Sequence, residues 1–349
     1  MKKRIISALL FVVLCVGLMP TTLATATYRD VPTNHWAAED IAYATKLGIF
    51  QGVGDGEFGR GQEISRAAFV TAMVRMFGWE MVTPANATFT DVTKERWYYS
   101  AVETAVANDA IPTATQTFRP NEPLKRGEMA SILLRALGYT SLAGTVNSYQ
   151  CPFADVTVNK GFITMAYDMG LVSGMGNGVF SPDTYATREQ AATILVRLYD
   201  RLATAPKQLS DTTGRATVSV SIPKAEAGTE LPTTPLEPMA QLYDALRTAK
   251  ERGQDMSHLV LVLTAGGVRT IVSETGEIVS SEVISAQEVA DILAEPSVRL
   301  YYSQRYESAY CVYQPNFYQT VTVWYQSAES LAVKLQLAQM FGVVHYSFQ

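Results

Sequence analysis

An arginine stands at the first position of a predicted helix in three parts of this chain. The clearest case is Arg188, because Thr187 before it is a good N-cap and Gln190 completes a Thr-x-x-Gln capping box. At a helix N-terminus, unpaired backbone N–H groups and the helix dipole favour an anion, and a guanidinium can grip both oxygens of a carboxylate. We therefore predict carboxylate-binding sites at three helix starts, those of Arg66, Arg126 and Arg188.

The residues beside the arginine differ among the three sites. The first site has a sound cap in Ser65, but Ala68 takes the place of the acid or amide that would complete a capping box. The second site has Lys125 instead of a hydroxyl cap, so it gains a second cation, and Glu128 follows three residues later. We expect the first and third sites to contribute more to binding than the second. The alternative is an ordinary exposed arginine, or one that pairs with a neighbouring acid.

The three arginines occupy the same position in three copies of one repeated unit. Each copy opens with an aromatic-x-Asp-Val motif, and a loop aromatic stands eight residues before each arginine: Phe58, Phe118 and Phe180. The copies cover residues 28–79, 89–139 and 153–200. Each copy has the pattern of two helices joined by a loop, and one such hairpin cannot bury its own apolar faces. We therefore predict a mainly α N-terminal domain in which the three copies pack against each other.

The loop between the two helices is rich in glycine in copies one and three. It has the sequences GVGDGEF and GMGNGVF, in which Asp55-Gly56 and Asn177-Gly178 are turn signals that accept positive φ. Copy two has TATQTF there, so we expect a different loop.

These motifs together resemble the S-layer homology domain, the cell-wall anchoring module of many Gram-positive surface proteins. The resemblance implies that three repeats form a three-pronged pseudo-trimer. It also implies the ligand, a secondary cell-wall polysaccharide that carries a ketal-linked pyruvate. A pyruvate ketal is a carboxylate, which agrees with the chemistry of the helix starts. Carbohydrate binding is thereby assigned to the arginines, their caps, the loop glycines and two tryptophans: Arg66, Arg126, Arg188, Ser65, Thr187, Gly56, Gly178, Trp36 and Trp97.

Two further sets of residues recur in the copies and have more than one interpretation. Trp36 and Trp97 lie eight residues after the opening aromatic, where copy three has Gly161. They could stack on a sugar, but we favour a role in pinning the first helix in the core. The aspartates of the opening motif could be ligands. We favour a role in capping the first helix or in bracing the opening loop.

Residues 1–26 have the pattern of a signal peptide. A positive start, MKKR, precedes a short apolar run, and a small-x-small site ends at Ala26. The alternative is a membrane anchor, but the apolar run is short for a spanning helix. We expect a secreted protein on the cell wall or S-layer, with no stable membrane insertion after cleavage. The net charge of −5, with no basic stripe, argues against nucleic-acid binding.

The C-terminal part changes in composition. Residues 203–235 are predicted to be a linker in which TVSVSI could form one strand, and residues 236–349 a small α/β or α+β domain. This domain resembles, more weakly, the last third of family 18 glycoside hydrolases, through AKERG…LVLVL and the VTVWYQSAESLAVKLQ run. That family's general acid ends an Asp-x-x-Asp-x-Asp-x-Glu motif, which is absent from the sequence. About 114 residues also cannot close an eight-stranded barrel. We therefore predict a non-catalytic remnant that resembles a partial barrel.

Other kinds of site have little support in the sequence. The histidines His35, His258 and His345 form no catalytic triad or metal spacing, and no cofactor motif is present. The cysteines Cys151 and Cys311 are expected to be free thiols. The predicted function is non-covalent anchoring of a secreted protein to the wall. Two alternatives are a truncated or divergent glycosidase that acts on wall glycan, and an S-layer structural subunit.

Overall fold

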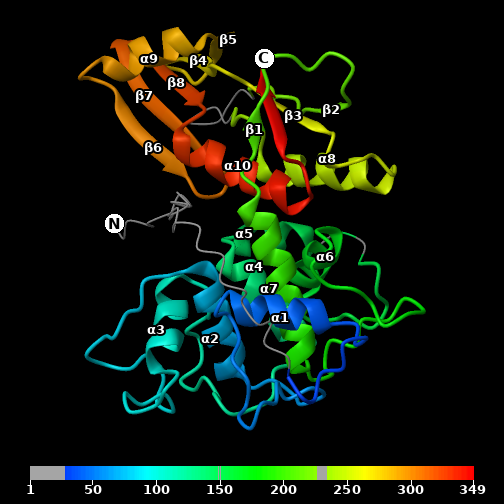
Figure 1. Cartoon of the computed structure of the whole chain (residues 1–349). Helices are drawn as coiled ribbons and strands as arrows, with labels where there is room; N and C mark the ends of the chain where they lie inside the picture. Colours follow the sequence, from blue (N-terminus) through cyan, green and yellow to red (C-terminus); the bar gives the residue numbers. More distant parts are fainter. Residues whose placement is uncertain (1–27, 148, 150, 226–233) are drawn as a thin grey trace, which may run out of the picture. The chain divides into compact units, whose positions relative to one another are not determined.

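The computed structural model describes residues 28–147, 149, 151–225 and 234–349 (Figure 1). The predicted signal peptide therefore lies outside the described residues. The chain divides into two compact units, the first ending at Arg201 and the second beginning at Leu202. The first unit is helical and holds the repeats, and every strand among the described residues belongs to the second, as predicted. Within the described part of the chain, no helix has the length and apolar character needed to cross a membrane.

The N-terminal unit consists of two helices for each copy of the repeat. One additional helix, α5, stands between copies two and three. The helices are α1 (Ala38–Lys46), α2 (Arg66–Phe77), α3 (Tyr99–Ala107), α4 (Arg126–Ala136), α5 (Thr140–Val146), α6 (Lys160–Asp168) and α7 (Arg188–Ala203). The second helices α2, α4 and α7 begin at the three arginines, as the capping pattern predicted.

The three copies close on each other through a ring of backbone hydrogen bonds. Leu124 N donates to Ile64 O at 2.8 Å, Ala186 N to Leu124 O at 2.8 Å, and Ile64 N to Ala186 O at 2.9 Å. All three residues are fully buried. Each precedes the second helix of its copy by two residues, so the ring fixes the three helix starts around one point. The three-pronged outline of the repeats stays a prediction.

Gly161 explains why copy three lacks the tryptophan of the other copies. The residue lies in α6, which packs against α5, the helix that copies one and two do not have. A Cβ atom at Gly161 would collide with the carbonyl oxygen of Ala143 in α5. The inserted helix therefore occupies the space of a side chain, and only glycine fits.

We expect Gly161→Ala to destabilise the N-terminal unit by about 1–3 kcal/mol, because backbone must shift to admit the methyl group. Chemical denaturation followed by circular dichroism measures the change. The matched control is Gly144→Ala in α5, where an added Cβ meets nothing within 4 Å. That change should be neutral or stabilising, by up to about 1 kcal/mol. Equal effects of the two substitutions would show that α5 does not constrain Gly161.

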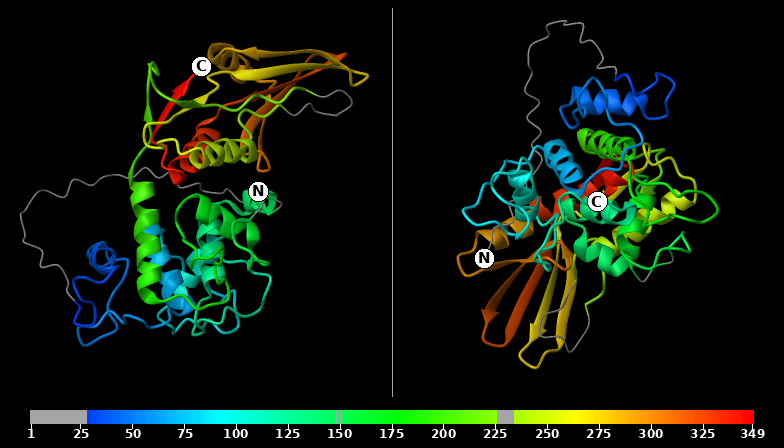
Figure 2. Two further views of the ribbon diagram at one scale, coloured as in Figure 1. Left: turned by 90° about the vertical axis from the view of Figure 1, so that its right-hand side faces the viewer. Right: turned by 90° about the horizontal axis from the view of Figure 1, so that it is seen from below.

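In the residues that the structure describes, the C-terminal unit contains two sheets and three helices (Figures 1 and 2). A parallel sheet has the strand order β1 (Lys207–Gln208), β9 (His345–Phe348), β3 (Val260–Leu263) and β2 (Thr217–Val218). An antiparallel sheet has the order β5 (Ile278–Ile284), β4 (Gly267–Ser273), β8 (Gln319–Tyr325), β7 (Ser308–Asn316) and β6 (Arg299–Ser303). The helices are α8 (Met239–Glu251), α9 (Ala286–Ala294) and α10 (Ala328–Met340).

The strands β1 and β2 come from the segment that was predicted to be a linker. They pair with β9 and β3, so the C-terminal unit begins about 34 residues before the predicted boundary at 236, at Leu202. Each strand is two residues long. β2 lies at the start of TVSVSI, where a strand was expected, whereas no strand was expected at β1. Residues 226–233 of the same segment lie outside the described residues.

The C-terminal unit holds a fully buried ion pair. Lys334 in α10 places its Nζ 3.1 Å from Glu237 Oε2, and it also donates to Leu236 O at 2.6 Å and to Gln326 Oε1 at 2.7 Å. Glu237 Oε1 in turn accepts from the amide of Thr264 at 2.8 Å. The exposed fractions of the lysine and glutamate side chains are 0% and 1%. The pair therefore ties α10 to the segment before α8 and to the end of β3.

Candidate functional site

Each of the three arginines reaches into the loop of another copy. The Nε–H donates to the carbonyl of the loop aromatic, with Arg66 bonding Phe118 at 2.9 Å, Arg126 bonding Phe180 at 3.2 Å and Arg188 bonding Phe58 at 2.8 Å. The guanidinium carbons lie 5.2, 4.7 and 5.0 Å from the centres of the same rings. The arginine of copy one thus binds the loop of copy two, that of copy two binds the loop of copy three, and that of copy three binds the loop of copy one.

The aspartates of the opening motif brace these loops. Oδ1 of Asp30, Asp91 and Asp155 accepts the amide of the loop aromatic at 2.8, 2.8 and 2.9 Å, and the following amides donate to Oδ2. They do not cap the first helix, since α1 and α3 have no side-chain cap. The aspartates therefore fix the carbonyls that receive the arginines.

The brace by Asp155 should make the stability of the N-terminal unit depend on acid pH. The amides of Phe180 and Ser181 hold the pKa of Asp155 below its ordinary 3.8, because they donate to the ionised form. A lowered pKa contributes stability above the unfolded value, which is lost as the pH falls through the folded value.

We expect Asp155→Asn to lower the thermal midpoint at about pH 7 and to have a smaller effect at about pH 2.5. Thermal unfolding of the variant and the parent at both pH values tests this expectation. A difference in midpoint that is the same at both pH values would contradict it.

The first amides of the second helices are used inside the molecule. Arg66 N donates to Glu122 O at 3.0 Å, Arg126 N to Thr184 O at 2.9 Å and Arg188 N to Gln62 O at 2.9 Å. The amides of Ala67 and Gly127 also donate to the next copy. The expectation of bare amides is therefore wrong for these groups, because the packing of the copies needs them. The predicted caps are confirmed, since Ser65 Oγ accepts from Ala68 N and Thr187 Oγ1 from Gln190 N.

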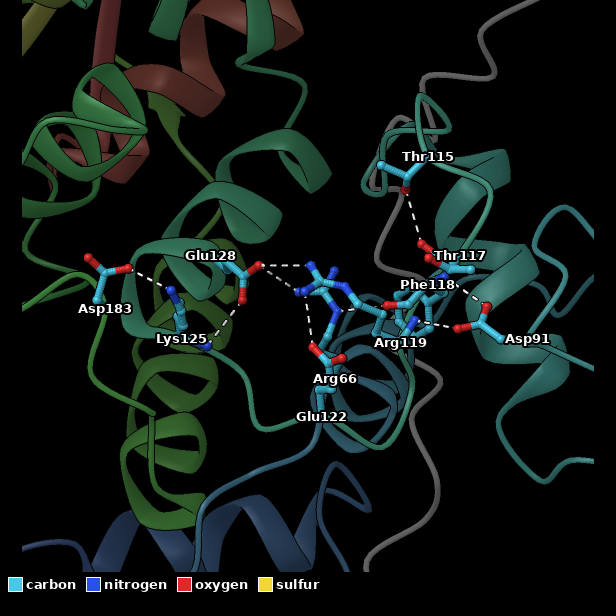
Figure 3. A network of polar contacts seen from close by, with 10 residues as sticks. All are labelled: Arg66, Asp91, Thr115, Thr117, Phe118, Arg119, Glu122, Lys125, Glu128 and Asp183. Atoms are coloured by element: carbon cyan, nitrogen blue, oxygen red, sulfur yellow. Dashed lines mark hydrogen bonds and ion pairs between the residues drawn. The ribbon is translucent and has the colours of Figure 1, made fainter.

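The three arginines differ in their charged partners, and Figure 3 shows those of Arg66. Arg66 Nη1 lies 3.0 Å from Glu128 Oε1 of copy two, although the approach is not along an N–H bond and no hydrogen bond of good geometry forms. Lys125, the expected second cation, is paired with Asp183 at 2.7 Å. Among the described residues, no carboxylate lies within ion-pair distance of Arg126 or Arg188. Their Nη2 atoms donate instead to the carbonyls of Ser173 and Gln51, each at 2.9 Å.

By the exposed surface of the whole residue, Arg126 is the most buried of the three arginines. The residue is 7% exposed, and burial lowers the pKa of its side chain. Arginine keeps its proton throughout the physiological range, so a positive charge stands here without a counter-ion. A desolvated charge of this kind attracts an anion more strongly than an exposed one does.

A cavity of about 190 Å³ lies beside Arg126. All three copies contribute to it, since its lining includes Trp36 of copy one, Ser173 and Met175 of copy three, and Arg126 itself. Trp36 and Trp97 are 61% and 67% exposed, so the favoured interpretation of both as core residues is wrong. The side chain of Trp36 instead forms part of the wall of this cavity.

A second set of polar residues lines the same cavity, of which Gln190 was expected only as part of the capping box, and Thr193 and Arg197 were missed in the sequence. Gln190, Thr193 and Arg197 project from successive turns of α7, and Thr193 Oγ1 is buried with no hydrogen-bond partner. The pattern Arg-x₈-Arg recurs in every copy, with a hydroxyl residue five positions after the first arginine. The second arginines are Arg75, Arg135 and Arg197, and the hydroxyl residues are Thr71, Ser131 and Thr193. This repetition is the signal that could have identified them.

The loop glycines shape turns and do not line the cavity beside Arg126. Asp55 and Gly56 have φ values of 50° and 72°, and Asn177 and Gly178 have 51° and 70°. Two successive positive φ values form the tight hairpin turn that the sequence predicted. The glycine at the cavity wall is Gly174, three residues before Asn177.

Ser257, His258 and Asp255 lie in contact in the C-terminal unit without forming a catalytic triad. Ser257 Oγ and Asp255 Oδ2 both contact the same ring nitrogen, His258 Nδ1, at 3.2 and 2.8 Å. A relay needs the two partners on opposite nitrogens. Hydrogen bonds from Ser257 lower the pKa of Asp255 to about 2, as in a tight turn. No group of three or more His, Cys, Asp or Glu in the described ranges could hold a metal ion.

Comparison with known families shows which domain the three repeats match. Residues 27–70, 88–130 and 152–192 match the family model of the S-layer homology domain. The chain is 33% identical over 138 residues to a cellulosome-anchoring protein of Acetivibrio thermocellus, covering 38% of this chain and 30% of that protein. It is 23% identical over 227 residues to the S-layer protein sap of Bacillus anthracis, covering 64% and 28%. The chain thus spans less than a third of the length of these relatives.

Solved structures give matches at low scores. The spore cortex-lytic enzyme SleL of Bacillus cereus is 11% identical, with a TM-score of 0.33 over 66% of this chain and 60% of that one. A family 18 chitinase from Cycas revoluta is 21% identical, with a TM-score of 0.26 over 30% and 32%.

Proposed function

This chain carries three S-layer homology domains, and from that premise we propose that it anchors itself to the cell wall by binding pyruvylated secondary cell-wall polysaccharide. The chain is a cell-surface, wall-associated protein, in keeping with its anchoring and S-layer relatives. The pyruvate, the groove that binds it and the non-catalytic role of the C-terminal unit are our proposal. The arrangement of the repeats as a three-pronged pseudo-trimer belongs to it as well.

One observation carries the proposal: a buried, unpaired arginine beside an exposed tryptophan. The guanidinium of Arg126 has no carboxylate partner among the described residues and opens on a cavity whose wall includes Trp36. An acidic sugar would supply the missing anion, and the apolar face of its ring would stack on the indole. Gln190 and Thr193 offer polar groups for the sugar hydroxyls.

The charges favour a different ranking of the grooves from the one that the loops suggested. Arg66 has an internal carboxylate, whereas Arg126 and Arg188 do not. By the equivalence of the copies, Trp97 stands in the groove of Arg188 as Trp36 does in that of Arg126, and Gly161 in the groove of Arg66. We therefore propose Arg126 and Arg188 as the principal ligands and Arg66 as the weakest.

Sedimentation with purified cell walls tests the proposed function. The protein should sediment with pyruvylated walls and stay in solution when the pyruvate has been removed by mild acid. Walls with the polysaccharide stripped away serve as the background. Equal retention on pyruvylated and depyruvylated walls would overturn the carboxylate account.

The C-terminal unit is proposed to be non-catalytic. The sequence lacks the motif that supplies the family 18 general acid, and the aromatic Trp324 is 4% exposed, stacked on Tyr310 at 4.6 Å as part of the packing. Incubation with chitin oligomers and with peptidoglycan should release no reducing ends above a blank. Release that depends on an acidic residue of this unit would contradict the proposal.

A further inference from the structure

One edge of the antiparallel sheet is a strand with no built-in protection. Among the described residues, β6 pairs only with β7, through five residues in continuous register, and it ends the order β5-β4-β8-β7-β6 (Figure 1). At the opposite edge, β5 has a bulge in which Val279 has no partner in β4. Bulges and prolines are devices that keep an edge strand from pairing. β6 has neither, and its Leu300 and Tyr301 are 60% and 43% exposed.

A row of stacked aromatic rings crosses the sheet and ends at this edge. Tyr301 in β6 is opposite Tyr310 in β7, which is opposite Trp324 in β8. The ring centres are 5.1 and 4.6 Å apart, and the planes are 17° and 24° from parallel. The rings thus repeat at about the spacing of neighbouring strands, roughly 4.7–4.9 Å. Tyr301 stacks on no other ring in the described chain, so its outer face is open to a ring on an added strand.

We infer that β6 pairs with β6 of a second copy of this chain, antiparallel and about a two-fold axis at Tyr301. In this register Tyr301 is directly opposite its counterpart in the second copy. The row of rings then continues from one copy into the other, and the two sheets become one. The inference does not depend on the proposed sugar ligand.

The sequence of β6, Arg-Leu-Tyr-Tyr-Ser, fits itself in this register. Leu300 is opposite Tyr302 of the second copy, so its exposed side chain gains an apolar neighbour. Arg299 is opposite Ser303, so like charges do not face each other. The two copies of Arg299 are four residues apart along the paired strands, about 14 Å, which exceeds the screening length of about 8 Å. A two-fold contact also covers the β6 edge of both copies, so this pairing stops at a dimer.

A dimer would present two sets of repeats to the same wall. When one set is released, the other would still hold the assembly close to its binding sites. The C-terminal unit would thereby contribute to anchoring without binding the wall itself.

Exchanging the charge at position 301 tests the register, because this residue alone is opposite itself. Sedimentation velocity of the full chain without its first 26 residues should show a dimer fraction that rises with concentration. Tyr301→Lys and Tyr301→Glu should each weaken the dimer by about tenfold or more, since like charges replace the stacked rings. An equimolar mixture of the two variants should recover the dimer, because opposite charges then face each other.

Val283→Lys is the matched control, since Val283 is 64% exposed on the other edge strand, β5, and this variant should dimerise like the parent. Leu300→Lys is a second probe of the β6 edge that leaves the ring stack intact, because Leu300 lies on the other face of the sheet. It should also weaken the dimer. A parent that stays monomeric up to about 100 μM would overturn the inference. So would a dimer that persists in both Tyr301→Lys and Leu300→Lys, or one that is lost in Val283→Lys. If both variants at position 301 keep the parent's circular dichroism, a mixture that stays monomeric would overturn the register.

Discussion

Replacing Arg126 by alanine is expected to weaken binding to pyruvylated wall polysaccharide by about 10- to 150-fold. The reason is that hydrogen bonds to a charged group contribute about 1.5–3 kcal/mol, and this guanidinium has no internal anion to satisfy it. Calorimetry with the polysaccharide measures the loss. Arg126→Lys keeps the charge but not the two-pronged geometry, so its loss should be intermediate.

Arg66→Ala is the matched control for Arg126→Ala. It removes an equivalent arginine that bonds an equivalent carbonyl, but one that Glu128 already neutralises. We expect at most a threefold effect on binding, and a similar loss of stability in both variants, because both lose a link between copies. Thermal unfolding verifies the second point. Equal losses of affinity in the two variants would show that the counter-ion does not rank the grooves.

Lys334→Met is expected to destabilise the C-terminal unit by about 3–5 kcal/mol, because it leaves Glu237 charged and uncompensated in full burial. Burial lowers the pKa of Lys334, and Glu237 opposes this shift by favouring the charged form. The charged form of each residue is thus stabilised by the charge of the other. Replacing both residues, as Lys334→Met/Glu237→Gln, should recover much of the loss because no buried charge remains.

An exposed ion pair in the same unit provides the control. Arg269 and Glu282 are 2.6 Å apart on neighbouring strands, with side chains 28% and 53% exposed. Arg269→Met should cost no more than about 1 kcal/mol. Hydrogen exchange of the β8 amides during urea titration reports on this unit separately from the repeats. A loss for Lys334→Met as small as that for Arg269→Met would mean that the buried pair is not needed for stability.

The sequence was most informative where the pattern repeats. Three copies of one motif indicated the S-layer homology repeats, the starts of α2, α4 and α7, and the turns at Asp55 and Asn177. Spacing within a copy could not tell which copy a side chain reaches. Arg188 follows Phe180 by eight residues, yet it bonds the carbonyl of Phe58, because the copies interlock in a ring. The expectation of unpaired amides at the helix starts was wrong for the same reason, because these amides donate to carbonyls of neighbouring copies.

Burial was harder to predict than secondary structure. A tryptophan in a helical repeat is usually buried, but Trp36 is exposed at a cavity to which residues 130 or more positions away contribute. Only the repeated Arg-x₈-Arg spacing pointed to Arg197, and its meaning depends on knowing which helix faces which loop. In the C-terminal unit the presence of strands together with helices agrees with the prediction. The pairing of β1 and β2 with distant strands left no local signal.

The central claim is that a sugar carboxylate binds the guanidinium of Arg126 beside Trp36. A crystal structure of the full mature chain with a pyruvate-ketal hexosamine glycoside tests it most directly. The account predicts the ketal carboxylate within hydrogen-bond distance of Arg126 and the sugar ring over the indole of Trp36. A ligand bound elsewhere, with Arg126 bonded only to the carbonyls of Ser173 and Phe180, would contradict it.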